Sequence, residues 1–285
     1  GIVAARRPGD TIITGHRCHG FLLACGIEPE PVMAELLGRE SGISGGLAGS
    51  MHLMAPEVGF YGGHAVPGAQ VGLGLGLAFA AQKRGQGEAT ILCYGDALAR
   101  RGGLGEYYAL AAAWRLPAVF VIENNAFNTA EALDRLDDDA LRTPALAQHI
   151  PAEAVDGMDV EAVTEATTHA LAHVRAGQGP FLLEMRSFRY RGHHALSAAE
   201  SARHRDAAAQ VRRTRDPLER LRQRLLQADP DHATALAALE RSVKARIAAA
   251  AAAARTAPEP APETLHTHVL APQPQHSPET APVSA

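Results

Sequence analysis

Three short apolar segments along the chain are typical of buried strands in a parallel sheet. They are Ala89–Tyr94 (ATILCY), Ala118–Ile122 (AVFVI) and Phe181–Met185 (FLLEM). Each is apolar throughout instead of alternating with polar residues, as expected for a strand that is covered on both faces. We therefore predict a mostly parallel sheet built from these segments.

Segments with helical periodicity separate the predicted strands. Ala69–Lys83 precedes the first strand, Leu104–Trp114 lies between the first and second, and Val160–Ala176 precedes the third. This alternation predicts an α/β fold with helices on both faces of the sheet. The part of the chain before Gly68 is rich in Gly and His and lacks a regular period, so we expect loops and short helices packed over the sheet there.

Glycines occupy alternate positions of the first predicted helix, at Gly72, Gly74 and Gly76. Because glycine weakens a helix, three of them predict a neighbour that packs close to the helix backbone. They do not form a dinucleotide-binding fingerprint, because those glycines follow a strand and these precede one.

The character of the chain changes after Arg191. Pro217–Gln227 and Asp231–Ala254 are predicted helices, and prolines accumulate beyond Thr256. We predict an α/β domain over residues 1–200, a helical C-terminal extension of the same domain over residues 201–270, and a disordered proline-rich tail over residues 271–285. The chain begins at Gly1 and not at Met, so we interpret its N-terminal segment as truncated, which leaves a targeting peptide untestable.

Composition narrows the functional class. The chain has 285 residues, 46% of them hydrophobic, and a formal net charge of −4. The negative charge gives no general attraction to nucleic acid, and no apolar run is long enough to span a bilayer. The three cysteines lie far apart without paired spacing, which argues against a disulfide framework or a cysteine zinc site and is typical of a reducing compartment.

Polar residues follow two of the predicted strands at the point where each strand ends. Asp96 follows the first, and Glu123, Asn124 and Asn125 end the second. Ligands of open α/β sheets bind at the carboxyl ends of strands, so Asp96 and Asn125 are expected side by side in one crevice. Carboxylate and amide oxygens suit Mg²⁺ with phosphate oxygens as further ligands. Taken alone, Asp96 is equally compatible with a capping residue.

These residues also form part of a longer resemblance. Gly95-Asp96 and Asn125, 29 positions after Asp96, resemble the thiamin diphosphate motif, GDG followed after about thirty residues by NN. Further matching blocks occur in order: GSMHL, YGGHAVPGAQ, AAWRLPAVFVIENN, VDGMD, GPFLLEMRSFRYRGHH and DPLERL. Together they resemble the α subunit of the 2-oxo acid dehydrogenase E1 component, of the pyruvate dehydrogenase type. The resemblance implies the thiamin diphosphate-binding α/β fold.

The resemblance implies a role for particular residues. Asp96 and Asn125 would bind Mg²⁺ through their side chains, and Phe127 would bind it through its carbonyl oxygen. Arg17 and Arg189 would contact the diphosphate, since guanidinium groups suit phosphate oxygens.

Further positions complete the implied site. His193 matches the histidine of the active-site loop and is the candidate catalytic residue. The remaining implied cofactor-binding positions are His16, Ala65, Pro67, Gly95, Ala97 and Leu98.

The family also implies an activity and partners. The chain would act in oxidative decarboxylation of pyruvate or a close 2-oxo acid and pass the acyl group to a lipoyl-bearing E2 enzyme. It would be active only with an E1 β subunit, in an α2β2 heterotetramer, and a bacterial cytoplasmic location is expected. Neither nucleic acid nor membrane is an expected partner.

Departures from the motif keep alternatives open. Ala97 replaces the second glycine of GDG, and Pro67, which has no N–H, stands where the family usually has valine. Arg100 and Arg101 replace polar residues, and His194 replaces a serine. The alternatives are an acetoin dehydrogenase α subunit and a degenerate, non-catalytic partner subunit with weak cofactor binding. A simple nucleotide-binding α/β protein fits poorly, because no glycine-rich phosphate loop follows the first strand.

Overall fold

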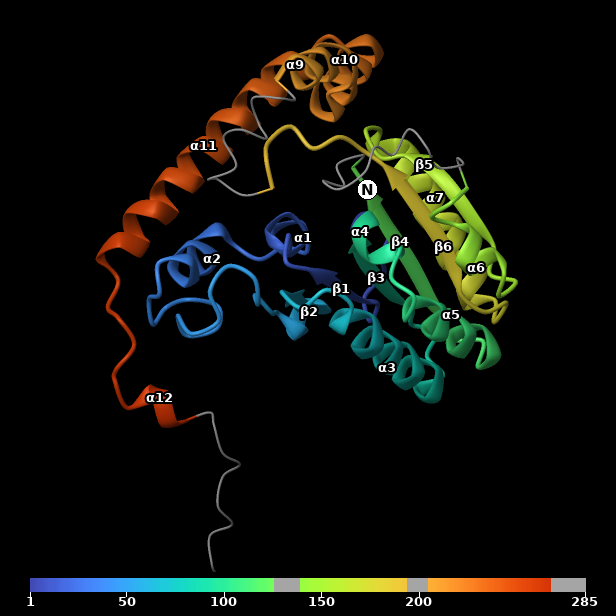
Figure 1. Cartoon of the computed structure of the whole chain (residues 1–285). Coiled ribbons are helices and arrows are strands. Elements are labelled where there is room, and N and C mark those ends of the chain that lie inside the picture. Colours follow the sequence, from blue (N-terminus) through green and yellow to red (C-terminus); the bar gives the residue numbers. More distant parts are fainter. Residues whose placement is uncertain (126–138, 194–204, 268–285) are drawn as a thin grey trace, which may run out of the picture.

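A six-stranded, entirely parallel sheet forms the centre of the protein (Figure 1). The structure is a computed structural model that describes residues 1–125, 139–193 and 205–267. The strand order is β2-β1-β3-β4-β6-β5. The strands are β1 (Thr11–Gly15), β2 (Phe60–His64), β3 (Thr90–Gly95), β4 (Ala118–Asn124), β5 (Ala152–Asp156) and β6 (Phe181–Arg186).

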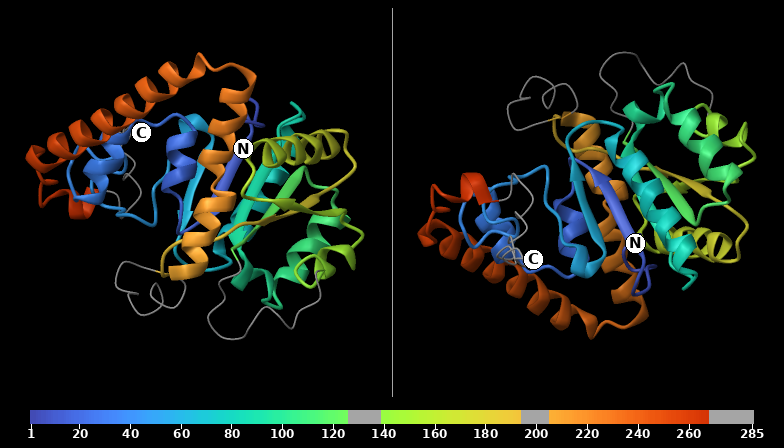
Figure 2. Two further views of the ribbon diagram at one scale, coloured as in Figure 1. Left: turned by 90° about the horizontal axis from the view of Figure 1, so that it is seen from above. Right: turned by 90° about the horizontal axis from the view of Figure 1, so that it is seen from below.

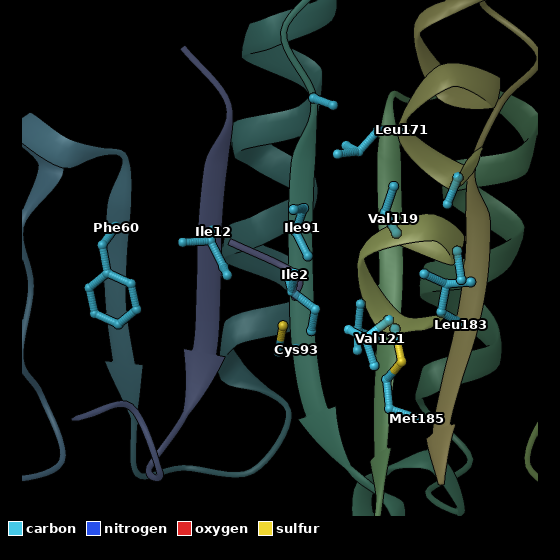
Figure 3. Packing of buried hydrophobic residues seen from close by; sticks show 14 of the residues in the cluster. Ile2, Ile12, Phe60, Ile91, Cys93, Val119, Val121, Leu171, Leu183 and Met185 are labelled. Carbon is cyan, nitrogen blue, oxygen red and sulfur yellow. The ribbon is translucent and has the colours of Figure 1, made fainter. Parts of the chain in front are cut away.

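Helices cover both faces of the sheet, as predicted. One face carries α1 (His19–Ala24), α2 (Pro29–Leu36) and α7 (Val160–Arg175), and the other carries α3 (Ala69–Arg84), α4 (Asp96–Ala99), α5 (Leu104–Ala113) and α6 (Thr143–Leu146). Successive residues of each strand point to opposite faces and so enter two separate apolar clusters. On β3, Ile91 and Cys93 enter the cluster under α7 (Figure 3), whereas Leu92 and Tyr94 enter the cluster under α3 and α5.

The segment before Gly68 differs from its prediction. It contributes β1 and β2 to the sheet as well as loops, two short helices and the 3₁₀ helix η1 (Pro56–Val58). Neither strand was predicted from the sequence, because each is only five residues long and contains polar or glycine residues: TIITG and FYGGH. β5 was not predicted either, because this edge strand, AEAVD, has few fully buried positions.

Close packing against the backbone of α3 is confirmed for two of its three glycines. A Cβ atom on Gly74 would lie 2.4 Å from Cδ2 of Leu92, and one on Gly72 would lie 3.2 Å from the Tyr107 hydroxyl oxygen. Gly76 has open space, with no described atom within 4 Å of such a Cβ. Gly74 is therefore required for the contact between α3 and the sheet, and Gly76 is not.

The chain then continues into a helical extension. Its members are α9 (Arg205–Arg215), α10 (Pro217–Ala228), α11 (His232–Thr256) and α12 (Thr264–Thr267). α11 leads away from α10 along the side of the molecule and packs against α2 at its far end, where Ala250 and Ala254 are buried (Figures 1 and 2). The proposed tail, residues 271–285, lies outside the described residues. Among the helices that the structure describes, none has the length and apolar character needed to cross a membrane.

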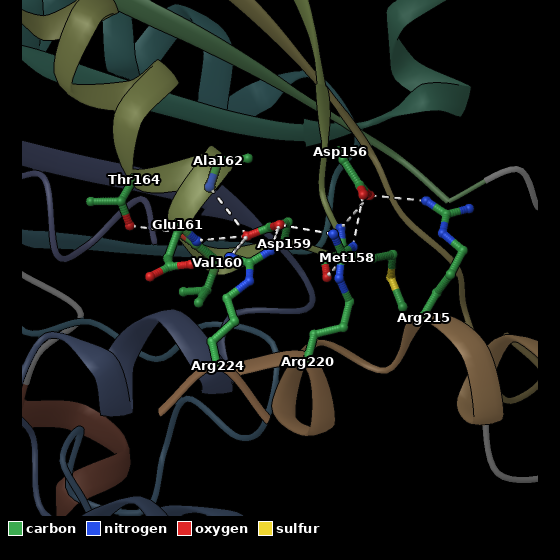
Figure 4. A network of polar contacts seen from close by, with 10 residues as sticks. All are labelled: Asp156, Met158, Asp159, Val160, Glu161, Ala162, Thr164, Arg215, Arg220 and Arg224. Atoms are coloured by element: carbon green, nitrogen blue, oxygen red, sulfur yellow. Dashed lines mark hydrogen bonds and ion pairs between the residues drawn. The ribbon is translucent and has the colours of Figure 1, made fainter. Parts of the chain in front are cut away.

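Ion pairs dock α10 onto the sheet domain (Figure 4). Arg220 pairs with Asp156, at the end of β5, and with Asp159, each at 2.8 Å. Asp159 caps the N-terminus of α7 and also pairs with Arg224. The guanidinium groups beside these carboxyls hold the pKa of Asp159 below its usual range. The network therefore fixes α10 at the carboxyl edge of the sheet.

Candidate active site

A cavity of about 190 Å³ with several charged side chains in its lining opens at the carboxyl ends of the central strands. The chain leaves β1 toward β2 on one side and leaves β3 toward β4 on the other, so the cavity lies where the direction of strand connection reverses. Ligands of open α/β sheets bind at this kind of position. The cavity is lined by Gly15, His16, Arg17, Tyr94, Gly95, Asp96, Ala97, Glu123, Asn125, Arg189 and His193.

Asp96 is the buried carboxylate of this cavity. It directly follows β3 and begins α4, and its residue is only 5% exposed. Burial raises the pKa of Asp96 above its ordinary value, although the Ala97 N–H and the charge of Arg100 oppose this shift. Its Oδ2 atom is buried and has no hydrogen-bond partner among the described residues. A bound cation would supply the missing partner.

Asn125 lies beside Asp96 on the neighbouring strand end. β3 and β4 pair in parallel, with Gly95 opposite Glu123, and both Asp96 and Asn125 line the cavity. The predicted juxtaposition of these two residues is therefore present. Phe127, the third implied metal ligand, lies outside the described residues. A carboxylate and an amide oxygen fit Mg²⁺, which keeps few protein ligands and completes its shell with water and phosphate.

Two arginines face the cavity from different strands. Arg17 follows β1 and Arg189 follows β6. An Nη atom of Arg17 donates a hydrogen bond of 2.6 Å to the backbone oxygen of His193. Nη atoms of Arg17 and Arg189 lie 3.4 Å and 3.3 Å from Nδ1 of His193. The cavity thus combines a buried carboxylate with two guanidinium groups, a charge pattern suited to a metal and an anion bound together.

His16 lines the cavity beside Arg17 and His193. Its ring centroid lies 5.7 Å from that of His193. Burial, and then the charge of Arg17, lower the pKa of His16, so the ring is neutral near pH 7. Its Nε2 atom is buried without a hydrogen-bond partner in the described parts of the chain. A neutral imidazole there can still donate one hydrogen bond to a ligand oxygen.

A glycine-rich loop, residues 42–50, fixes the position of the turn that carries His16 and Arg17. The backbone oxygen of Ser50, in that loop, accepts hydrogen bonds from Nε2 of His19 at 2.8 Å and from Sγ of Cys18 at 3.6 Å. Cys18 is fully buried between this turn and β2, and a Cβ atom on Gly63 would lie 2.5 Å from its sulfur. The loop therefore sets the position of the turn relative to the sheet.

Glu35 on α2 in turn organises this loop. Its carboxylate is buried and accepts four backbone N–H groups. Oε2 accepts from Ser44 and Gly46 at 2.9 Å and 2.8 Å, and Oε1 accepts from Ala48 and Gly49 at 2.7 Å and 3.0 Å. Because four N–H donors satisfy its buried charge, the Glu35 carboxylate can hold the loop in place.

Three cavity residues were not among the candidates from sequence: Gly15, Tyr94 and Glu123. Glu123 is the penultimate residue of β4 and lines the cavity, and burial raises its pKa to about 7 while the charge of Arg17 opposes the shift. Tyr94, the residue before Gly95, hydrogen-bonds to the Tyr108 hydroxyl at 2.6 Å beneath the cavity. The signal for Glu123 was present, because it adjoins Asn124 and Asn125 at the predicted strand end.

Three implied cofactor residues do not line the cavity. Ala65 and Pro67 follow β2 at the same carboxyl edge, and Leu98 is buried in the core beneath α4. Ala97 does line the cavity, and it lies within α4 with a negative φ, so its methyl group causes no backbone strain. Arg100 and Arg101 are exposed outside the cavity lining.

Comparison with known proteins gives a consistent assignment. The family model described as "Dehydrogenase E1 component" matches residues 1–263. The chain is 44% identical to the pyruvate dehydrogenase E1 component subunit alpha of Zymomonas mobilis over 272 residues, which covers 95% of this chain and 76% of that relative. It is 42% identical to the subunit of the same name from Rhizobium meliloti over 228 residues, covering 79% of this chain and 65% of that relative.

One solved structure shows a weaker likeness. The X-ray structure of a putative thiamin diphosphate-dependent enzyme from Mycobacterium smegmatis matches with a TM-score of 0.42 and 15% identity, over 66% of this chain and 30% of that chain. This likeness is too weak to add to the sequence matches. Because the family model spans most of the chain and the relatives share over 40% of aligned residues, the chain belongs to the dehydrogenase E1 component family.

Proposed function

We propose that this chain is the α subunit of a pyruvate dehydrogenase-type E1 component that binds thiamin diphosphate through Mg²⁺. The observation that supports this most directly is the Oδ2 atom of Asp96, which has no hydrogen-bond partner among the described residues and lies beside Asn125 in a cavity with two arginines. A buried carboxylate oxygen without a partner is costly unless a ligand satisfies it. The names of the relatives, which are pyruvate dehydrogenase subunits, supply the proposed reaction.

The described residues divide the binding of this cofactor among them. Asp96 and Asn125 would hold the metal, and Arg17 and Arg189 would bind the diphosphate by charge-assisted hydrogen bonds. When bound, thiamin diphosphate provides the nucleophilic carbon and the electron sink that decarboxylation of a 2-oxo acid requires. The protein's part is to fix the diphosphate at the strand ends and to exclude water from the cavity.

The complete enzyme requires partners in this proposal. A β subunit would contribute the rest of the active site in an α2β2 heterotetramer, and a lipoyl-bearing E2 enzyme would receive the acyl group. The relatives named above are bacterial, which supports a bacterial cytoplasmic location.

Calorimetric titration with thiamin diphosphate, on the chain co-expressed with its β partner, tests the site. We expect binding that requires Mg²⁺ and that is lost in Asp96→Asn, which keeps the size of the side chain but removes its charge. Asp231→Asn, an exposed substitution at the start of α11, serves as the control and leaves binding unchanged. Equal binding with and without Mg²⁺, or by Asp96→Asn, would contradict the assignment of Asp96.

One observation favours a second candidate, a subunit with weak cofactor binding. Pro67 has no N–H to offer, and neither it nor Ala65 lines the cavity. If the missing donor limits affinity, Pro67→Val strengthens cofactor binding, by about tenfold for a contribution near 1.4 kcal/mol. Ala97→Gly is the comparison, and the negative φ of Ala97 predicts little change from it. Unchanged weak binding in Pro67→Val would contradict this explanation.

The substrate separates the pyruvate enzyme from its acetoin-using alternative. With an artificial electron acceptor, the assembled enzyme is expected to release carbon dioxide from pyruvate. Reduction of the acceptor with acetoin but not with pyruvate would assign the chain to the alternative.

A further inference from the structure

His193 is held by both arginines of the cavity at the same ring nitrogen. Nη2 of Arg17 lies 3.4 Å from Nδ1 of His193, and Nη1 of Arg189 lies 3.3 Å from it. Nη2 of Arg17 also donates to the backbone oxygen of His193 at 2.6 Å. The ring and the backbone of this residue are therefore both tied to arginines that come from two different strand ends.

The chemistry of the two side chains decides where the proton of the imidazole lies. A guanidinium group is a permanent cation that only donates hydrogen bonds, so the nitrogen that faces two of them must be an acceptor. A proton on Nδ1 would point at two cations and lose both contacts. In a neutral imidazole with Nδ1 unprotonated, the proton resides on Nε2.

We infer that Arg17 and Arg189 hold His193 as the neutral tautomer with its proton on Nε2, so that His193 acts in the cavity as a hydrogen-bond donor. Arg17 and Arg189 are then positioning residues for His193, in addition to any role toward phosphate.

The other charged and titratable groups of the cavity are compatible with this tautomer. His16 approaches the His193 ring and is itself a neutral ring near pH 7. The carboxylates that line the cavity are Asp96 and Glu123, and the contacts recorded for Nδ1 of His193 in the described residues come from arginines. Two cations at hydrogen-bond distance outweigh more distant groups, because electrostatic interaction falls with distance.

The consequence for catalysis rests on the proposed function. An Nε2–H donor can stabilise negative charge that develops on a substrate oxygen in the transition state, whereas an unprotonated Nε2 would repel it. The structure therefore assigns His193 an electrophilic role and not that of a general base.

Nuclear magnetic resonance of the full chain, labelled with ¹⁵N-histidine and free of cofactor, tests the tautomer directly. Long-range ¹H–¹⁵N correlation distinguishes the two neutral tautomers and the imidazolium ion, and His193→Gln assigns the signal by its loss. We expect His193 to show a protonated Nε2 and an unprotonated Nδ1 near pH 7. A protonated Nδ1, or an imidazolium ion at this pH, would overturn the inference.

Variants of the arginines test their positioning role. In the double variant Arg17→Gln/Arg189→Gln, the His193 signal is expected to move toward a mixture of tautomers. The double variant Arg17→Lys/Arg189→Lys keeps both positive charges and should therefore keep much of the original chemical shift. Arg100→Gln removes an exposed charge near the cavity that makes no recorded contact with His193, and it should leave the signal unchanged. An unchanged signal in the double Gln variant would show that the arginines do not set the tautomer.

The outcome is separate from that of the cofactor titration. A chain that binds no thiamin diphosphate can still show the Nε2–H tautomer of His193. Conversely, a chain that binds thiamin diphosphate can lack this tautomer.

Discussion

Two buried carboxylates show how differently single residues are used in this protein. Glu35 accepts four backbone N–H groups, whereas Oδ2 of Asp96 has no partner among the described residues. A satisfied buried charge stabilises its surroundings, and an unsatisfied one is retained at a cost that a ligand can offset. The contrast separates a structural carboxylate from a binding one without reference to relatives.

Replacing Glu35 tests its structural role. Glu35→Gln keeps the shape but turns one acceptor into an NH₂ group that faces two N–H donors. We expect a loss of about 3 kcal/mol in the free energy of unfolding, since buried donors lose their partner. Chemical denaturation of the cofactor-free chain measures it, and Glu30→Gln, an exposed change on the same helix, should remain within about 0.5 kcal/mol of the parent. An unchanged free energy of unfolding in Glu35→Gln would show that the loop does not depend on the Glu35 carboxylate.

At this scale the sequence located the centre of the candidate site but not all of its lining. Asp96 and Asn125 could be placed together because polar residues followed two apolar strands, and neighbouring parallel strands end at one edge. Glu123 was visible at the same strand end, yet nothing in the sequence says which side chain of three consecutive polar residues points into a cavity. The contacts of Arg17 with His193 join parts of the chain that no local pattern connects.

At the scale of elements, α3 shows that glycines of one helix serve different purposes. Gly74→Ala would place a methyl group 2.4 Å from Leu92 and 2.9 Å from Ile13, so α3 must move away from the sheet. We expect a loss of about 1–3 kcal/mol in stability. Gly76→Ala meets open space in the described structure and should stabilise the isolated chain by up to about 1 kcal/mol. Thermal unfolding of both variants measures the difference, and equal effects would contradict the packing.

The docking of α10 gives a second test at this scale. Asp159→Ala removes the cap of α7, whose carboxylate accepts the N–H groups of Glu161 and Ala162, and also removes a partner of Arg220. We expect a loss of about 1–2 kcal/mol from the cap alone and faster proteolytic cleavage near α10. Asp231→Ala, at the start of α11, where no side-chain cap bond forms, is the matched control. Similar effects of the two changes would exclude the network as the cause.

The elements themselves were predictable to the extent that they were long and regular. The helices over α3, α5, α7, α10 and α11 and the strands β3, β4 and β6 follow the sequence pattern. β1, β2 and β5 do not, because short strands with glycine or polar residues acquire their conformation from their neighbours. Thr11 of β1, for example, is paired through its hydroxyl with Thr90 of β3 at 2.8 Å. Such pairing is a tertiary interaction that a local pattern does not contain.

For the whole molecule, half-buried histidines are expected to contribute to the response of stability to acid. Burial, and then the charge of His169, lower the pKa of His173 below its ordinary value of 6.5, and its ring packs edge-to-face against Phe181. At pH values between the lowered pKa of His173 and 6.5, the unfolded chain binds more protons than the folded chain. Stability is therefore full above about pH 6.5 and falls as the pH decreases through this window.

Unfolding midpoints measured from about pH 7.5 down to about pH 5 test this dependence. His173→Gln should flatten the decline, whereas His266→Gln, exposed on α12, should leave it unchanged. A decline of equal steepness in His173→Gln and the parent would assign the acid sensitivity to other groups, of which His16 is the first candidate because its pKa is also lowered.

The strand order has a consequence for how the protein is made. β1 lies inside the sheet, between β2 and β3, yet it is synthesised before either of them. While translation proceeds, both of its edges present unpaired N–H and C=O groups that can pair with another chain. The turn after β1 carries Arg17, whose contact residue His193 emerges only after all six strands. We therefore expect a nascent chain to need protection of β1 until β3 is available.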